Sequence, residues 1–138
     1  MKQYFVDSNI FLRYFNKDEP KHAAAAAALF KKAKDGDIEL FCGPPVFFEI
    51  AWVLRSFYKL ANSDILDTLE SILSIPNLKI SDVEHVGAAI ALARRKNRGF
   101  ADSYIAVTAL DKNMGIATFN GKHFAAFGTE LYPFIAAI

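Results

Sequence analysis

Short β-prone runs alternate with helical segments along this chain, and this alternation constrains the fold more than any other feature. The runs are residues 4–6, 38–42, 78–80 and 114–119. Such an alternation implies an α/β fold with a mainly parallel sheet, strand ends gathered along one edge, and helices on both faces. With 138 residues, 53% of them hydrophobic, the sequence predicts one compact domain over residues 1–138.

Composition excludes several classes of protein. Cys42 is the single cysteine, so no disulfide can form within the chain and nothing indicates an oxidising compartment. No apolar run reaches the eighteen or so residues of a membrane helix, and the N-terminus shows no cleavable leader. We therefore expect a soluble, cytoplasmic protein with no membrane partner. The formal net charge of +1 becomes a mild positive excess if several acids are sequestered in a site.

The first β-prone run ends abruptly at Asp7, where a helix is predicted to begin. Tyr4, Phe5 and Val6 are continuously apolar, which suits a central strand covered on both faces. In open α/β sheets ligands gather where strands end and helices begin, so Asp7 is a candidate ligand or catalyst. The alternative is that Asp7 only caps the helix that begins around Asn9.

Glu49 is the one charge in the strongly apolar segment 46–54, which we predict to be a buried helix. Glutamates are almost never fully buried without a partner, so Glu49 either reaches solvent or meets a cation. An exposed position on an amphipathic helix is the alternative explanation.

Asp102 lies at the electropositive start of another apolar helix. Helix capping would also explain this position. Asn120 and Gly121 are predicted to turn the chain at the end of the fourth run. The cluster before Asp102 is either a solvated helix end or a phosphate-binding patch, and it consists of Arg94, Arg95, Lys96 and Arg98.

Asp7 and Asn120 come at the ends of predicted strands, and Glu49 and Asp102 lie near the starts of predicted helices. In a parallel sheet these four residues can converge on the carboxyl edge. Two carboxylates about 4 Å apart repel by roughly 4 kcal/mol, which is large beside a total stability of about 5–15 kcal/mol. A cation must therefore join them. Oxygen ligands without paired cysteines or histidines favour Mg²⁺ or Mn²⁺, ions that can activate water and neutralise a reacting phosphodiester.

These residues resemble the PIN-domain ribonucleases, most closely the toxin subunits of VapBC-type toxin–antitoxin pairs. The resemblance covers nearly the whole chain. Each motif is short, and their order and spacing make the set specific. The motifs are Val6-Asp7-Ser8-Asn9-Ile10, Phe48-Glu49-Ile50, Phe100-Ala101-Asp102-Ser103-Tyr104-Ile105-Ala106 and Thr118-Phe119-Asn120.

The resemblance implies a three-layer α/β/α fold with a mainly parallel sheet of four or five strands. It implies that Asp7, Glu49 and Asp102 are metal-binding catalytic acids, with Mg²⁺ or Mn²⁺ as cofactor and RNA as substrate. It also implies an antitoxin partner and a homodimer. One position departs from the pattern: many relatives carry a fourth acid where Asn120 stands, so we expect one firmly bound metal and count Asn120 as a weaker ligand.

We hypothesise that a water oriented by Asp7 and Asp102 attacks the scissile phosphate, while Arg94, Arg95 and Arg98 hold the RNA backbone and Asn9 contacts substrate. Two rivals remain. A receiver-like phosphoacceptor domain would normally place paired acids near the first strand, whereas Ser8 and Asn9 follow Asp7 here. A PIN-like module that binds RNA or protein without cutting is separated from a nuclease only by an assay.

Overall fold

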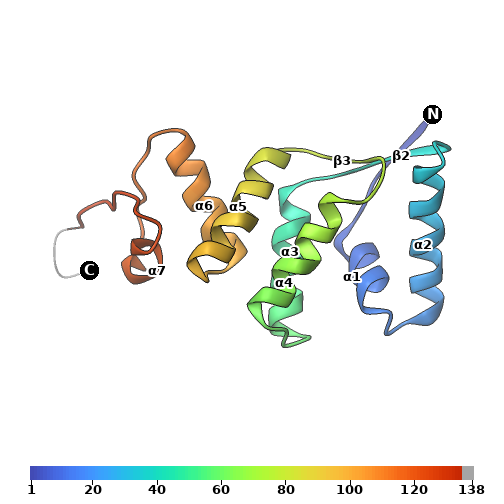
Figure 1. Cartoon of the computed structure of the whole chain (residues 1–138), viewed down its shortest axis with the longest axis horizontal. Coiled ribbons are helices and arrows are strands. Elements are labelled where there is room, and N and C mark those ends of the chain that lie inside the picture. Colours follow the sequence, from blue (N-terminus) through green and yellow to red (C-terminus); the bar gives the residue numbers. More distant parts are fainter. Residues whose placement is uncertain (135–138) are drawn as a thin grey trace. The chain divides into compact units, whose positions relative to one another are not determined.

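The computed structural model of the chain describes residues 1–134. The chain divides into two compact units, Met1–Glu84 and His85–Ile138, which are described in turn (Figure 1). That residues 1–138 form a single domain stays a prediction.

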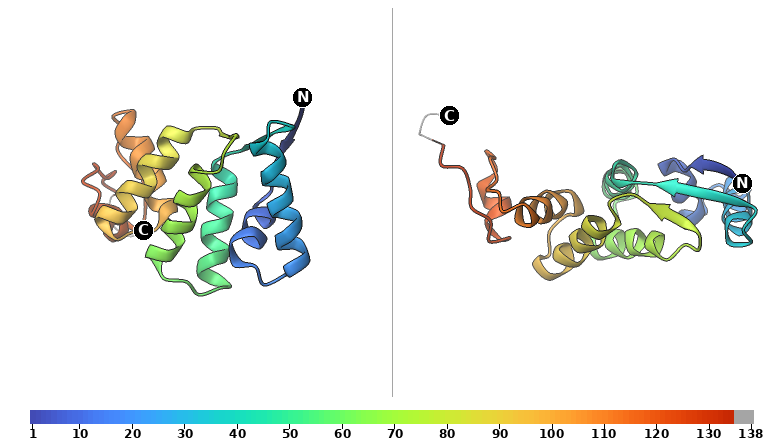
Figure 2. Two further views of the ribbon diagram at one scale, coloured as in Figure 1. Left: turned by 45° about the vertical axis from the view of Figure 1, so that its right-hand side comes forward. Right: turned by 90° about the horizontal axis from the view of Figure 1, so that it is seen from above.

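The first unit contains a small sheet and four helices. Its elements are β1 (Lys2–Phe5), α1 (Ser8–Asn16), α2 (Pro20–Lys34), β2 (Ile38–Cys42), α3 (Pro44–Ser56), α4 (Asn62–Leu73) and β3 (Leu78–Ile80). The α/β class and the parallel sheet are confirmed, because β1 pairs with β2 and β2 with β3 in parallel. The three strand arrows lie side by side in the view from above (Figure 2).

Strand β2 is the centre of this sheet. Leu40 is paired with Tyr4 on one side and Leu78 on the other, and Leu40 and Cys42 are almost completely buried. The prediction that the first strand is central and covered on both faces is wrong for the described residues, since β1 forms an edge and its four residues are exposed.

The helices of the first unit supply its core. Helix α1 packs against α2 and α3, and α3 packs against α4. Phe11 of α1 is completely buried, and its ring stacks on Phe30 of α2 with centroids 5.6 Å apart. Prolines at the first positions of α2 and α3, Pro20 and Pro44, suit helix starts because the amide hydrogen they lack has no helical partner there.

The second unit holds α5 (Val83–Lys96), α6 (Phe100–Asp111) and α7 (Gly121–Ala125). Helix α5 begins two residues before the boundary. Apolar side chains from all three helices and the segment after α6 form one core, with buried members Leu92, Ala106, Ala109, Ile116, Phe124 and Phe127. Within residues 1–134, no helix has the length and apolar character needed to cross a membrane.

The fourth predicted strand, residues 114–119, is reduced to one parallel bridge between Ile116 and Leu131. Local turns limit the pairing, because Asn120 donates its backbone N–H to Thr118 Oγ1 (2.9 Å) and Phe134 donates its backbone N–H to the Tyr132 carbonyl (3.0 Å). The described sheet therefore has three strands where four or five were predicted.

Candidate active site

Asp7 lies at the junction of β1 and α1, as the sequence predicts. It occupies the position before the first residue of α1 with extended backbone angles (φ −78°, ψ 157°). Its side chain is exposed and makes no capping hydrogen bond with the helix. Asp7 therefore occupies the capping position of α1, but capping does not explain why this position holds a carboxylate.

Ser8 connects this junction to Glu49. The Ser8 side chain is buried and its hydroxyl donates a hydrogen bond to Glu49 Oε1, across 41 residues of sequence. Glu49 itself is exposed on α3, and Trp52 of the same helix is also exposed, so the alternative explanation of an exposed position on an amphipathic helix is confirmed. The bond fixes the Glu49 carboxylate next to the residue that follows Asp7, and two of the predicted acids thus belong to one locality of the first unit.

Asp102 is the third residue of α6, not the residue that caps it. Gly99 holds the capping position, and the first turn is closed by the Ser103 hydroxyl, which donates to the Gly99 carbonyl (2.8 Å). N-capping by Asp102 is therefore wrong. Asp102 is half-buried, and its Oδ2 lies 3.5 Å from His123 Nδ1. A carboxylate in the first turn also interacts favourably with the helix dipole.

Asn120 is exposed and immediately precedes α7, so its role as a turn former is confirmed. Its carbonyl accepts a hydrogen bond from the backbone N–H of His123 (3.0 Å). His123 thereby touches both Asn120, through the backbone, and Asp102, through its ring. Two predicted ligands of the second unit share one neighbour.

The basic cluster forms the exposed end of α5. Arg94, Arg95 and Lys96 lie in its last turn, where cations favour the helix dipole. Asn97 adopts a left-handed conformation (φ 52°) that ends the helix, and Arg98 follows it in an exposed position. The cluster is exposed, which leaves it accessible to a polyanion, and the choice between a helix end and a phosphate-binding patch stays a prediction.

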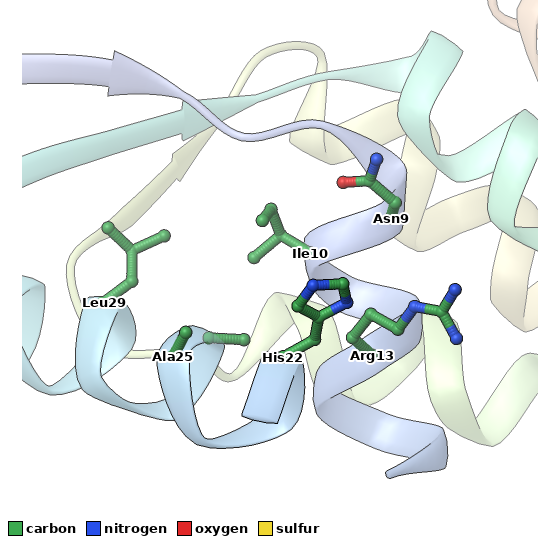
Figure 3. A pocket seen from close by; sticks show the side chains of 7 residues that line it. Asn9, Ile10, Arg13, His22, Ala25 and Leu29 are labelled. Carbon is green, nitrogen blue, oxygen red and sulfur yellow. The ribbon is translucent and has the colours of Figure 1, made fainter. Parts of the chain in front are cut away.

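Asn9, the predicted substrate contact, opens onto a pocket of about 500 Å³ between α1 and α2. Figure 3 shows the lining side chains, with Asn9, Ile10 and Arg13 on α1 and His22, Ala25 and Leu29 on α2. The two basic side chains at its rim have local partners: Arg13 pairs with Asp18 (3.2 Å), and His22 Nδ1 lies 3.6 Å from Glu19 Oε2.

Asp18 has a second partner, 40 residues further along the chain. Tyr58, just beyond α3, donates its hydroxyl hydrogen to Asp18 Oδ2 (2.8 Å). This hydrogen bond, more than the pairing with Arg13, holds the pKa of Asp18 below its ordinary value. The pocket rim is therefore fixed by a small network of exposed polar side chains.

The predicted ligands are divided between the units. Asp7 and Glu49 belong to the first, and Asp102 and Asn120 to the second. Over the described residues, neither unit alone gathers three His, Cys, Asp or Glu side chains close enough to hold a metal ion. The chemistry of the donors, carboxylate and amide oxygens, fits Mg²⁺ or Mn²⁺. The shared role of the four residues stays a prediction.

Sequence reasoning missed two residues that contact the predicted acids: Ser8, which bonds to Glu49, and His123, which lies beside Asp102. Ser8 was noted only as a small polar residue after Asp7, and its burial could not be inferred from one apolar run. Sequence patterns do not identify His123 as a neighbour of Asp102. Its spacing of three residues from Asn120 was the available signal, because that spacing places it in the turn that Asn120 begins.

Comparison with known proteins identifies the family. The PIN domain family model matches residues 4–129. No curated protein matches the sequence. Among solved structures, the chain is similar to a chain in the crystal structure of VapBC2 from Rickettsia felis bound to a DNA fragment from their promoter. Identity is 20%, coverage is 96% of this chain and 99% of that chain, and the TM-score is 0.37. The family match spans most of the sequence. The chain belongs to the PIN domain family.

Proposed function

We propose that this protein is a metal-dependent endoribonuclease, the toxin component of a VapBC-type toxin–antitoxin pair that acts in the cytoplasm. The observation that carries the proposal is the hydrogen bond from Ser8 to Glu49, which links a second acid to the Asp7 junction in a chain of the PIN domain family. A buried hydroxyl needs a hydrogen-bond partner, and the partner of Ser8 is an exposed carboxylate on another helix, so the bond holds Glu49 in one orientation beside the Asp7 junction.

The metal ligands in this proposal are Asp7, Glu49 and Asp102, with Asn120 as a weaker one. When bound, Mg²⁺ or Mn²⁺ lowers the pKa of water and offsets the charge that builds on the phosphate. Asn120 carries no charge, so a second ion would be held weakly and one ion per chain is expected. Exposure of Asp7 and Glu49 leaves both carboxylates able to meet a hydrated ion.

The residues of the chain would then divide the work of hydrolysis. Asp7 and Asp102 would orient the water whose oxygen bonds to phosphorus. As the ester P–O bond breaks, the water gives up a proton to solvent and the leaving oxygen takes up a proton from solvent. Ser8 keeps Glu49 in one orientation, as outer hydrogen bonds do for metal-binding carboxylates. Arg94, Arg95 and Arg98 hold the RNA backbone through charge, and Asn9 contacts a neighbouring nucleotide.

The partners follow from the family resemblance of the sequence motifs. A toxin of this kind would be held inactive by an antitoxin protein and would form a homodimer. The solved complex of VapBC2 from Rickettsia felis is described as bound to promoter DNA, a property of that complex. For this chain, purification with the product of a neighbouring short reading frame would support an antitoxin partner.

Cleavage of total RNA with Mn²⁺ tests the nuclease proposal. Wild-type protein should yield fragments, and Asp7→Asn or Asp102→Asn should lower the rate by about a hundredfold or more, because each removes a group that orients water. Asp64→Asn is the matched control, since Asp64 is also exposed in the first turn of a helix. Undiminished activity in either site variant would refute the proposal. RNA binding without metal-dependent products would instead favour a non-cleaving PIN-like module.

A further inference from the structure

Two segments of the second unit are joined tightly next to Asn120. Ile116 donates its backbone N–H to the Glu130 carbonyl, and Tyr132 donates its backbone N–H to the Ile116 carbonyl, both at 2.8 Å. Gly115 permits this approach, because a Cβ there would lie 3.0 Å from the Glu130 carbonyl oxygen. The residues that follow Ile116 and Leu131 are therefore held side by side.

Three aromatic side chains on these segments form a cluster, which we call the aromatic platform: Phe119, Tyr132 and Phe134. The Phe134 ring lies 4.7 Å from that of Phe119 and 4.7 Å from that of Tyr132, measured between centroids. Their exposed fractions are 77%, 61% and 41% in chain order. Single exposed apolar residues are ordinary, whereas adjoining ones mark surfaces that bind something.

The platform adjoins the predicted ligands of its own unit. Phe119 immediately precedes Asn120, and His123, three residues further, bonds to the Asn120 carbonyl and pairs with Asp102. Lys122 and His123 are both exposed at the start of α7. A ligand on the rings would thus lie near the Lys122 ammonium and, through His123, near the proposed catalytic acid Asp102.

This combination of flat apolar rings and the nearby Lys122 ammonium fits an unpaired nucleotide. Every base has a π-face that stacks on aromatic side chains, and cations beside the rings attract the phosphate. Bases in a duplex are already stacked and cannot reach such rings, so recognition by stacking selects loops and single strands.

We propose that the aromatic platform is a nucleotide-binding subsite that stacks one unpaired RNA base through Phe119, Tyr132 and Phe134. The inference rests on the proposed nuclease function. Phe119 is the principal contact, because it is the most exposed ring and adjoins Asn120. Loss of one stacked base weakens binding by about fivefold to more than a hundredfold.

The test uses a short single-stranded RNA that carries 2-aminopurine, whose fluorescence is quenched by stacking. Binding is measured with full-length Asp7→Asn protein in Mg²⁺, so that the RNA stays intact. Phe119→Leu in this background should weaken binding at least fivefold and relieve the quench, whereas Phe119→Tyr should retain both. Phe57→Leu is the matched control, since Phe57 is 74% exposed and also contacts a neighbouring aromatic ring, that of Tyr58, in the first unit.

Each possible result either supports the inference or overturns it. Unchanged affinity and quench in Phe119→Leu would overturn it, as would duplex RNA that competes as well as single strands. Sedimentation of RNA-free protein tests the other occupant: if Phe119→Leu splits a dimer while the quench persists, the platform is a contact between copies and the inference fails. Quenching with Phe119 dependence, together with a wild-type protein that cuts no RNA, would support the platform and refute the nuclease proposal alone.

Discussion

Ser8 shows how a single buried hydroxyl can determine the geometry of an exposed acid. Its side chain is 3% exposed, and its hydrogen bond to Glu49 joins α1 to α3. A carboxylate that accepts such a bond loses rotational freedom and presents its other oxygen in a defined direction. The first residue of α1 therefore influences the proposed metal site without contacting the metal.

Replacing this hydroxyl should weaken metal binding. Ser8→Ala should raise the Mn²⁺ concentration needed for half-maximal RNA cleavage by about 10–100-fold, the usual effect of losing a group that orients a ligand. Ser71→Ala is the control, because the Ser71 hydroxyl donates only to the backbone carbonyl of Asp67, one helical turn earlier. A Mn²⁺ requirement that is equal in both variants would show that Ser8 does not position Glu49.

Sequence reasoning was most successful for single residues. Asp7 could be chosen as a candidate because an apolar run stops at it, and its lack of a capping bond agrees with that choice. The capping explanation for Asp102 failed because the chain caps α6 with Gly99, whose missing side chain leaves no sequence signal of a cap. Which groups share a hydrogen bond over 41 residues depends on tertiary packing, which local patterns do not contain.

At the scale of elements, the contact between α1 and α2 carries much of the first unit's stability. Phe11 is completely buried against Phe30, and Tyr14 adds an edge contact to Phe30 with centroids 4.8 Å apart. Phe11→Ala should lower the free energy of unfolding by about 3–5 kcal/mol, from lost burial and the cavity left behind. Chemical denaturation measures this, with Phe57→Ala as an exposed control expected to change it by about 0.5 kcal/mol or less. A Phe11→Ala loss as small as the control's would mean that the two helices do not pack as described.

Strand β2 makes a prediction about pH. Burial raises the pKa of the Cys42 thiol from 9.0 to about 12. Between these values the unfolded chain has lost the thiol proton while the folded chain keeps it, so the unfolded state binds fewer protons and stability falls as pH rises. The loss is at most about 1.4 kcal/mol for each pH unit above 9. Urea unfolding at pH 8 and pH 10.5 should show a steeper decline for wild type than for Cys42→Ala, and parallel declines would contradict the burial.

Strands and helix ends were predicted well where the local residue types determine them. The second and third runs coincide with β2 and β3, and prolines and glycines place the helix ends between them. The run at 114–119 was predicted as a strand because it is apolar, but a strand also needs a partner in register. Its partner segment turns after Tyr132, and a hydrophobic pattern carries no information about that turn.

For the whole molecule, the central claim is that acids from separate parts of the chain share one ion. The claim predicts that the folded state binds Mn²⁺ and the unfolded state does not, so saturating metal should stabilise the protein by about 2.7 kcal/mol at a concentration of 100 Kd. Removal of the ion with a chelator should reverse this shift in thermal unfolding. Equal unfolding temperatures with and without Mn²⁺ would show that the fold holds no ion.

The measurement that tests the central claim most directly is Mn²⁺ binding by electron paramagnetic resonance, with wild type compared with Asp7→Asn, Glu49→Gln, Asp102→Asn and the control Asp64→Asn. We predict one Mn²⁺ per chain in wild type and in the control, and a large loss of affinity in each of the three site variants. If Asp102→Asn binds Mn²⁺ as tightly as wild type does, the three acids do not share an ion and the account is wrong.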